Sequence, residues 1–253
     1  MYIPRHEKIL KILSLLREVS VPDLSERLSV SEVTIRKDLT ALENMGCLIR
    51  THGGAMIAED FRLIKTIDIR QRENLNAKQA IAVKAKELIS NGDMVYLDSG
   101  STCLMIAREI RDMDLQVVTN SIDIMAELSG AQNILLHSLG GSYRKESGTF
   151  IGPAAVKNLK EFQFSICFLG ATGFSSDGIF SSQNIVESEM KRQALLNSTR
   201  KVVTADSSKF GINAFSIFAR SEDIDILVTD NAFTEVEALA EHEIETIKAP
   251  IKV

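Results

Sequence analysis

Apolar residues recur with helical spacing in the first part of the chain. Over residues 5–19 they form a stripe of four, Ile9, Ile12, Leu13 and Leu16, which predicts an amphipathic helix. A second helix is predicted from Pro22 to about Leu28, with Ser20 near its cap. Only two residues separate it from a third helix, predicted over about 32–45. Three helices with such stripes can close one small core.

The third helix is predicted to have one buried and one exposed face. Ser31 can cap its first turn, and Gly46 can end it in the left-handed conformation. The face predicted to be buried carries Ile35, Leu39 and Leu42. The opposite face and its flanks carry Val33, Thr34, Arg36, Lys37, Thr40 and Asn44. Such groups suit phosphates and base edges, although each of them alone is equally typical of a solvated helix.

A hairpin is predicted after this helix. Cys47 to Arg50 forms its first strand, His52-Gly53-Gly54 the turn, and Ala55 to Ala58 the returning strand. Two short helices around a tight turn, followed by a hairpin, predict a winged helix-turn-helix, which is a DNA-binding module. The charged stretch that follows, residues 59–76, is predicted to be a linker leading into a helix.

Strands and helices alternate from residue 77 onward. The pattern predicts helices over 77–90, 101–111 and 122–129, and strands over 94–98, 115–120, 134–138, 164–170, 201–206, 224–230 and 245–247. This alternation predicts an α/β domain with a mostly parallel sheet covered by helices. In that fold a ligand binds at the carboxyl ends of the strands.

Polar residues gather where the predicted strands end. The run Asp98-Ser99-Gly100-Ser101-Thr102 lies between a strand and the start of a helix. Free amide protons, the helix dipole, a glycine and two hydroxyls together can hold an anion there, and phosphate is the natural occupant. A capped helix without a ligand is the alternative, because serine and threonine also favour caps.

Three further strand ends carry polar groups that a parallel sheet would bring to the same edge. They are Asn120 with Ser121, Gly140 and Gly141 ahead of Arg144 and Lys145, and the run from Asp206 to Lys209. Hydroxyls and carboxylates suit a sugar, and a lysine suits a phosphate or a sugar oxygen. Taken singly, each of these residues is as easily a turn or a cap.

Charge is distributed unevenly along the 253 residues, whose formal net charge is −5. Residues 1–58 hold 8 Lys and Arg against 7 Asp and Glu, and the remainder holds 21 against 27. The acidity therefore belongs to the second domain. Because the first domain is only weakly positive, DNA affinity is expected to need two or more modules on a repeated site, and a homo-oligomer is predicted.

The sequence offers little else for chemistry. Cys47, Cys103 and Cys167 are far apart and lack CxxC spacing, so reduced thiols in a cytoplasmic protein are expected. No apolar run of about 18 residues is present, and no signal peptide is expected from the N-terminal MYIPRHEK. The four histidines are scattered and no nucleophile has an evident partner, so no metal, cofactor or catalytic residue is expected.

The run SVSEVTIRKDLTALENMG, followed by RTHGGA, closely resembles the winged helix-turn-helix domain of DeoR-family transcriptional regulators over residues 3–58. This resemblance implies double-stranded operator DNA as a partner. The DNA contacts expected from the helix pattern and the resemblance are Ser31, Val33, Thr34, Arg36, Lys37, Thr40, Arg50 and His52. Lys37 stands where many members carry arginine. Lysine keeps the positive charge but lacks the guanidinium group that can form two hydrogen bonds to guanine. Arg36 is therefore the better candidate for a base contact.

Residues 77–253 are similar to the effector domain of the same family, which shares its fold with ribose-5-phosphate isomerase. The resemblance rests on DSGST, TNS, the Gly140-Gly141 turn, FLGATG and ADSSKFG. It implies a sugar phosphate held by Ser99 to Thr102, with Asp98, Asn120 and Lys209 near the sugar. The expected effector site is Asp98, Ser99, Gly100, Ser101, Thr102, Asn120, Ser121, Gly141, Asp206 and Lys209. The charged helix 186–198 could be surface, interface or ligand-facing, and its Lys191 and Arg192 are expected to serve structure or an interface.

These features predict a DNA-binding transcriptional regulator, a repressor of carbohydrate-metabolism genes controlled by a phosphorylated sugar. An isomerase-like enzyme with an appended DNA-binding domain is the alternative, because the isomerases use this pocket for proton transfer. The isomerases have acids in a DGADE-like strand end, whereas the corresponding place here reads Leu169-Gly170-Ala171-Thr172-Gly173. Asp98 and Asp206 could still act as bases.

Overall fold

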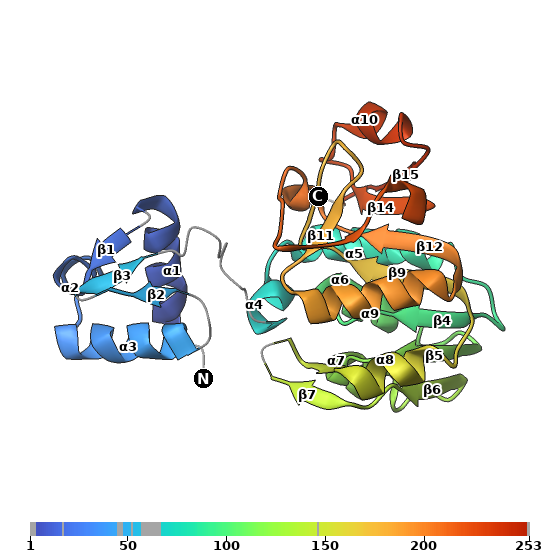
Figure 1. Cartoon of the computed structure of the whole chain (residues 1–253), viewed down its shortest axis with the longest axis horizontal. Helices are drawn as coiled ribbons and strands as arrows, with labels where there is room; N and C mark the ends of the chain where they lie inside the picture. The colour runs from blue at the N-terminus through green and yellow to red at the C-terminus, as the bar shows by residue number, and fades with distance from the viewer. Residues whose placement is uncertain are drawn as a thin grey trace. The chain divides into compact units, whose positions relative to one another are not determined.

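The computed structural model describes residues 4–16, 18–44, 48–51, 53–56, 67–145 and 147–251. The chain divides into two compact units, residues 1–66 and residues 67–253 (Figure 1). The six-residue helix α4, Ile67–Arg72, lies inside the stretch predicted as a linker and belongs to the second unit.

Three helices and a three-stranded antiparallel sheet form the first unit (Figure 1). The helices are α1 (Pro4–Leu16), α2 (Val21–Leu28) and α3 (Glu32–Asn44), and the strands are β1 (Glu18–Ser20), β2 (Ile49–Arg50) and β3 (Gly54–Met56), in the order β1-β3-β2. The predicted stripes meet in one core, in which Ile9, Leu13, Ile35, Leu39 and Leu42 are fully buried. Ser20 caps α2 as expected, because its Oγ accepts a hydrogen bond from the backbone N–H of Asp23 at 3.2 Å.

The first predicted helix is wrong at its end. It was expected to run to residue 19, but α1 ends at Leu16, whose side chain is 48 % exposed, and residues 18–20 form strand β1. β1 pairs with β3, so that Val19 lies opposite Ala55 and both are buried. Pairing with a distant strand provides partners for the backbone N–H and C=O groups of residues 18–20, and this pairing outweighs the helical periodicity. The predicted cap Gly46, Cys47 and the stretch from 57 to 66 lie outside the described residues.

A seven-stranded, wholly parallel sheet forms the centre of the second unit and confirms the α/β prediction. Its strands are β4 (Met94–Leu97), β5 (Leu115–Thr119), β6 (Ile134–Ser138), β9 (Phe164–Gly170), β12 (Ser198–Thr204), β14 (Ile226–Asp230) and β15 (Glu245–Ala249). Their order is β15-β14-β12-β9-β4-β5-β6. The chain leaves β4 in one direction and β9 in the other, so the switch point at which such folds bind ligands lies between these two strands.

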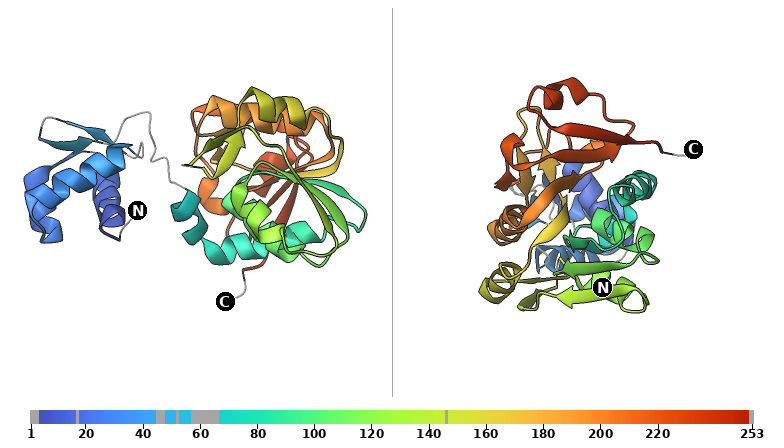
Figure 2. Two further views of the ribbon diagram at one scale, coloured as in Figure 1. Left: turned by 90° about the horizontal axis from the view of Figure 1, so that it is seen from below. Right: turned by 90° about the vertical axis from the view of Figure 1, so that its right-hand side faces the viewer.

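Helices cover both faces of this sheet (Figure 2). On one face lie α5 (Leu75–Lys86), α6 (Ser101–Glu109) and α7 (Ile122–Leu128); on the other lie α8 (Pro153–Leu159) and α9 (Ile185–Leu196), with the short α10 (Val236–Ala240) beyond them. The strands between them are buried on both sides and therefore read as nearly continuous apolar runs. Among the described residues, no helix is long and apolar enough to cross a membrane.

Five short antiparallel strands were not predicted. The hairpin β7 (Ser142–Arg144) and β8 (Thr149–Ile151) forms one small sheet, and β10 (Gly173–Phe174), β11 (Phe180–Ser182) and β13 (Ser216–Ala219) form another. Each has only two to four residues, too few to show the alternation by which a strand is detected in a sequence. Both small sheets follow strands or helices that end at the carboxyl edge of the large sheet.

Candidate functional site

Helix α3 is fixed in the first unit by a cap and by a partly buried ion pair. Ser31 caps the helix as predicted, since its Oγ accepts from the backbone N–H of Thr34 at 3.3 Å. The carboxylate of Asp38, buried against α1, is bound by Arg5 at 2.5 and 3.0 Å and by His6 at 3.2 Å. Burial would raise the pKa of Asp38, but the hydrogen bonds and charge of Arg5 outweigh it and lower that pKa. The exposed face of α3 is thereby held in a defined orientation.

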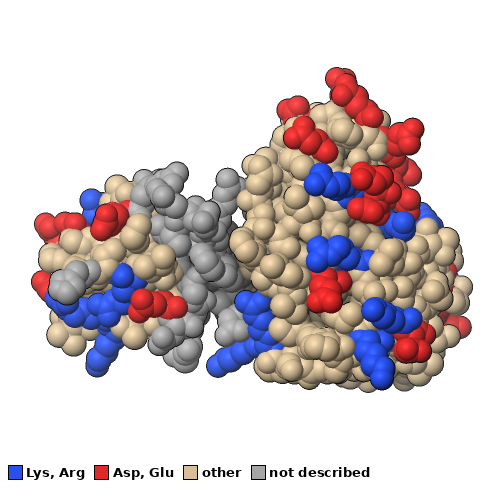
Figure 3. Space-filling view, in the orientation of Figure 1, with Lys and Arg blue, Asp and Glu red and all other residues tan. Residues whose placement is uncertain are grey.

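The exposed face of α3 carries the cations predicted to meet DNA. Val33 is 62 % exposed, and Arg36 and Lys37 are exposed beside it. Arg36 Nη2 lies 2.9 Å from Glu32 Oε2 in an exposed pair, and such pairs contribute so little that a phosphate or a base can replace the partner. Figure 3 shows Lys and Arg side chains gathered at the level of α3, whereas Asp and Glu gather around α10 of the second unit.

The wing is joined to α3 through Thr40 and Arg50. Arg50 Nη1 donates to Thr40 Oγ1 at 3.0 Å, and the same hydroxyl donates to the carbonyl oxygen of Arg36 at 2.9 Å. Both side chains were predicted to contact DNA, and the structure shows that they also fix the hairpin against the helix. His52, the other wing residue predicted to bind DNA, lies outside the described residues.

In the second unit, the ends of β4 and β9 meet at the switch point. The backbone N–H of Asp98 donates to the carbonyl oxygen of Phe168 at 3.0 Å, and Gly170 N–H donates to Asp98 Oδ2 at 3.0 Å. Gly100 and Gly170 are so close that a Cβ added to Gly100 would lie 3.5 Å from the Cα of Gly170. The predicted run from residue 98 to 102 is therefore packed directly against the β9 end.

The start of α6 has no side-chain cap. Its N-cap residue is Gly100, and Ser101 and Thr102 are buried but make no hydrogen bond through their hydroxyls within the described part of the chain. By contrast, Ser121 caps α7 and Asn184 caps α9. The amides of the first turn of an uncapped helix have no partner inside the helix. α6 is therefore not capped by a serine or threonine side chain, and the binding of an anion by its first-turn amides and hydroxyls stays a prediction.

Two predicted site residues have structural partners. Ser121 Oγ accepts from the backbone N–H of Ile124 at 3.4 Å and so caps α7. Asn120 donates to the carbonyl oxygen of Phe150 at 3.1 Å and accepts from the hydroxyl of Tyr96 at 3.4 Å, which ties the β7–β8 hairpin to β5. Their side chains hold the edge of the site together, and direct ligand contacts by them stay predictions.

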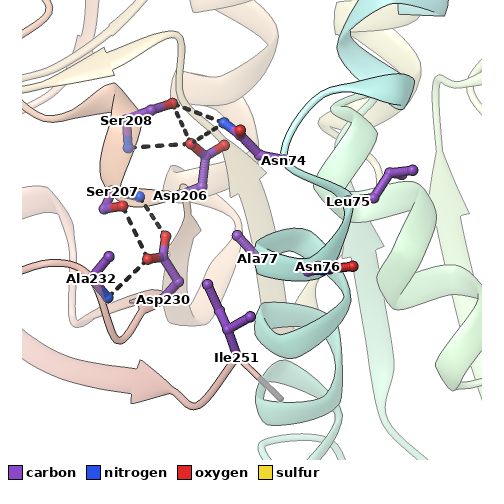
Figure 4. Close-up of a pocket in the computed structure, with 10 residues that line it drawn as sticks. All are labelled: Asn74, Leu75, Asn76, Ala77, Asp206, Ser207, Ser208, Asp230, Ala232 and Ile251. Carbon is purple, nitrogen blue, oxygen red and sulfur yellow. Dashed lines mark hydrogen bonds between the residues drawn. The ribbon is translucent and has the colours of Figure 1, made fainter. Parts of the chain in front are cut away.

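Asp206 lies at a separate pocket of about 490 Å³ farther along the same edge (Figure 4). Its Oδ1 accepts from Asn74 Nδ2 at 2.9 Å and from the backbone N–H of Ser208 at 3.2 Å. Asp230 caps the neighbouring loop, accepting from the N–H groups of Ser207 at 2.6 Å and Ala232 at 3.0 Å. The carboxylates thus order the loops around the pocket. Lys209 ends the same short turn but does not line the pocket.

Gly141 has a backbone role. Its φ is +111°, and a Cβ there would lie 2.7 Å from the carbonyl oxygen of Ile151. Only glycine combines this conformation with so close an approach. The predicted turn is therefore confirmed as a backbone requirement of the hairpin, and a ligand contact by Gly141 stays a prediction.

Lys191 lies beside Asp98 of the expected effector site, and its contacts agree with the structural role expected from the sequence; a role toward a ligand stays a prediction. Its ammonium contacts Asp98 Oδ2, donates to the carbonyl oxygen of Gly170 at 2.8 Å, and lies 5.3 Å from the centre of the Phe218 ring. Neighbouring Arg192 is exposed and donates to the carbonyl oxygen of Ile217 at 2.7 Å, in agreement with a structural role. A signal for Lys191 was present, because it shares the buried face of α9 with Ser188, Ala194 and Leu195.

Lys78 is the second buried lysine that the sequence analysis missed. It lies on the apolar face of α5, and its ammonium donates to the carbonyl oxygens of Arg70, in the last turn of α4, and of Glu73, the residue after α4. Burial lowers the pKa of Lys78 to about 8; the charge of Asp206 opposes this shift and that of Lys209 adds to it. Lys78 thus links the α4 segment to the carboxyl edge of the sheet.

The pKa of Lys78 predicts a pH dependence of stability. Because the pKa is about 8 in the folded chain and ordinary in the unfolded chain, the unfolded chain binds more protons above pH 8, and the unfolding free energy rises with pH there. Lys78→Met should remove this rise. Melting curves of both proteins between about pH 7 and pH 9.5 test this prediction. As the pH rises, the second unit of the native protein should gain stability relative to that of the variant. If the stability of both proteins changed with pH in the same way, the lowered pKa would not belong to Lys78.

Other chemistry has little support in the described residues. Cys103 and Cys167 are free and buried, and burial raises the pKa of their thiols to about 12 and about 11, so neither is a nucleophile at neutral pH. In the part of the chain that the structure describes, no three His, Cys, Asp or Glu side chains are placed to hold a metal ion. The uncapped first turn of α6 and the hydroxyls of Ser101 and Thr102 instead suit an anion.

Two family models match the two units. The DeoR-like helix-turn-helix domain matches residues 5–61, and the DeoR C terminal sensor domain matches residues 73–231. The chain belongs to the DeoR family of transcriptional regulators. The match over the second unit includes the Asp98 to Thr102 run, Lys191 and Asp206, so the site at the switch point lies within the DeoR sensor domain.

Relatives that match most of the chain are named transcriptional regulators or repressors. The HTH-type transcriptional regulator YulB of Bacillus subtilis is 32 % identical, over 98 % of this chain and 96 % of the relative. The transcriptional repressor AccR of Agrobacterium fabrum is 34 % identical over 87 % and 88 %. The lactose phosphotransferase system repressor of Lactococcus lactis is 33 % identical over 90 % of both chains. The chain is therefore a transcriptional regulator and not an isomerase.

Solved structures resemble the second unit only distantly. Ribose 5-phosphate isomerase A from Methanocaldococcus jannaschii is 19 % identical, covers 55 % of both chains and superposes with a TM-score of 0.42. The fold assignment accordingly rests on the parallel sheet and the family match.

Proposed function

We propose that this DeoR-family protein represses carbohydrate-metabolism genes, and that a phosphorylated sugar bound at the start of α6 controls its binding to operator DNA. The observation that carries the proposal is the uncapped N-terminus of α6 at the switch point, with the free hydroxyls of Ser101 and Thr102. The name of one relative, a lactose phosphotransferase system repressor, supports repression of sugar genes. The protein would act in the cytoplasm, where sugar phosphates and operators meet.

The proposed effector pairs a phosphate with a sugar because the site has two kinds of group. The first-turn amides of α6, with Ser101 and Thr102, donate hydrogen bonds and suit a phosphate. Asp98, at the end of β4, offers a carboxylate that accepts hydrogen bonds from hydroxyl groups. A ligand with a phosphate at one end and hydroxyls at the other uses both.

Operator binding in this proposal needs a homo-oligomer. The residues up to 58 have almost balanced charges, as counted above, and phosphate neutralisation supplies a large part of DNA affinity. Two recognition helices bound to a repeated operator multiply a weak individual affinity. The geometry of the oligomer would then decide whether both modules can bind at once.

Helix α4 offers a physical route from the effector site toward the DNA-binding unit. Gln71 Nε2 donates to Asp123 Oδ2 in the first turn of α7 at 2.7 Å, and Lys78 donates to the carbonyl oxygens of Arg70 and Glu73, so both contacts hold the C-terminal end of α4. α4 directly follows, in the chain, the residues that lead out of the first unit. For control, the effector must bind the DNA-bound and DNA-free arrangements with different affinities.

A thermal-shift screen tests the effector class. The purified protein is heated with glucose, fructose, ribose and galactose phosphates, with the same sugars unphosphorylated, and with inorganic phosphate. At least one sugar phosphate should raise the melting temperature of the second unit more than its unphosphorylated partner and more than inorganic phosphate. An equal shift by a sugar with and without phosphate would contradict the phosphate site, and no shift by any of them would contradict the effector class.

Arg36 and Lys37 are expected to make different contributions to operator binding. Arg36→Ala should cost about 1–3 kcal/mol on the operator and relax the preference for one base, because a guanidinium reads guanine bidentately. Lys37→Ala should weaken binding to every duplex alike and lower the salt slope by about 1. Fluorescence anisotropy on operator and scrambled duplexes over a salt series measures both effects.

The exposed Arg27 of α2 supplies a control of matched charge. Arg27→Ala should change the binding less than either α3 variant, because Arg27 lies outside the proposed recognition helix. If Arg36→Ala and Lys37→Ala weakened binding to all duplexes by the same factor, the assignment of base reading to Arg36 would be wrong.

A further inference from the structure

A buried ion pair forms one wall of the proposed effector site. Lys191 and Asp98 are 6 % and 3 % exposed, and they come from α9 and from the end of β4. The Lys191 ammonium contacts Asp98 Oδ2 and donates to the carbonyl oxygen of Gly170 at 2.8 Å, while the Phe218 ring lies 5.3 Å away. Segments from four parts of the second unit therefore meet at one ammonium group.

The two oxygens of the Asp98 carboxylate differ. Oδ2 accepts both from Lys191 and from the backbone N–H of Gly170 at 3.0 Å. Oδ1 accepts no hydrogen bond from any residue that the structure describes. An ionised carboxylate only accepts hydrogen bonds, so Oδ1 is an acceptor in need of a donor. A sugar hydroxyl is such a donor.

Stability alone is a poor reason for this pair. Removing two charges from water costs several kcal/mol for each ion, and replacing a buried pair by apolar residues is often neutral or stabilising. Asp98 also stands next to the α6 N-terminus, where an uncompensated carboxylate would repel a bound phosphate. Lys191 offsets that charge while leaving Oδ1 free. The arrangement fits a role in ligand binding.

We propose that Lys191 is a positioning residue of the effector site, which neutralises Asp98 and fixes its orientation so that Oδ1 accepts a hydrogen bond from a hydroxyl of the bound sugar phosphate. The inference rests on the proposed function and adds a condition on which ligands the site recognises. A ligand is recognised when it carries a hydroxyl within reach of Asp98 as well as the phosphate on α6. A phosphate monoester without hydroxyls uses only the α6 part of the site.

The test compares ligands and variants by isothermal titration calorimetry on the full chain. The probes are the four sugar phosphates of the thermal-shift panel, and ethyl phosphate as the monoester without a free hydroxyl. Lys191→Met should weaken sugar phosphate binding roughly ten- to hundred-fold, as expected for hydrogen bonds that involve charged groups. Lys191→Arg keeps the charge and should recover part of the affinity. Arg192→Gln, one residue along α9, is the matched control and should bind as the native protein does.

Removing both charges keeps the proposal falsifiable if Lys191→Met alone does not fold. The double variant Asp98→Asn with Lys191→Met is neutral in this wall, and should bind ethyl phosphate like the native protein while losing its preference for sugar phosphates. Native-like sugar phosphate affinity in folded Lys191→Met would overturn the proposal but leave the effector site standing. Failure of the native protein to bind any of the four sugar phosphates would instead overturn the proposed function.

Discussion

Replacing Ser101 by alanine together with Thr102 by valine is expected to abolish the effector response while operator binding survives. Both hydroxyls are buried at the uncapped start of α6 and have no partner among the described residues. In the proposed complex they donate to a charged phosphate, and each such hydrogen bond contributes about 1.5–3 kcal/mol. Their loss should therefore reduce the affinity for the sugar phosphate about a hundred-fold or more.

The same pair of substitutions can be made elsewhere as a control. Ser129→Ala with Thr234→Val removes one serine and one threonine hydroxyl at exposed positions of the second unit. This control should respond to effector as the native protein does. Calorimetry with the sugar phosphate and anisotropy with the operator measure the two activities separately. An intact effector response in the α6 variant would disprove the phosphate site.

Gly54→Ala is expected to have the opposite effect, abolishing operator binding while the second unit still binds its effector. A Cβ at Gly54 would lie 2.1 Å from the carbonyl oxygen of Val19 and 2.8 Å from the Cα of Ser20. These atoms belong to the backbone of β1, which pairs with β3, so relief requires the strands to separate. Overpacking of this kind costs about 1–3 kcal/mol or more, and it displaces both the wing and the cap of α2.

Gly53 provides the control for this substitution, because a Cβ there would have no atom within 4 Å. Gly53→Ala should bind the operator nearly as the native protein does and melt at a similar temperature. Native-like operator affinity in Gly54→Ala would show that the three-stranded sheet is not needed to present α3, and would contradict this account of the wing.

The large sheet was predictable because its strands are buried on both faces. Met94–Leu97, Leu115–Thr119 and Phe164–Gly170 each appear in the sequence as a short apolar run ended by polar residues. The helices between them carry stripes of the right period. β1 and β13 were not predictable in this way, because they have three and four residues and are stabilised by pairing with strands far away in the chain.

The parts of the site whose residues are adjacent in the sequence were predictable, whereas contacts between residues far apart in the sequence were not. Asp98 to Thr102 could be found because a strand end, a glycine and a helix start are adjacent in the sequence. The contact between Lys191 and Asp98 joins residues 93 positions apart, and Lys78 meets the turn before its own helix. A lysine within a charged helix is usually on the surface, so burial of these two needed tertiary packing to show it.

In the proposed mechanism, a sugar phosphate in the second unit controls operator binding. The operator affinity of the native protein is measured by anisotropy with and without the sugar phosphate that gives the largest thermal shift. A change of about 5- to 150-fold is expected with the sugar phosphate, and none with the unphosphorylated sugar. An operator affinity that stays constant while the sugar phosphate saturates the second unit would disprove this control.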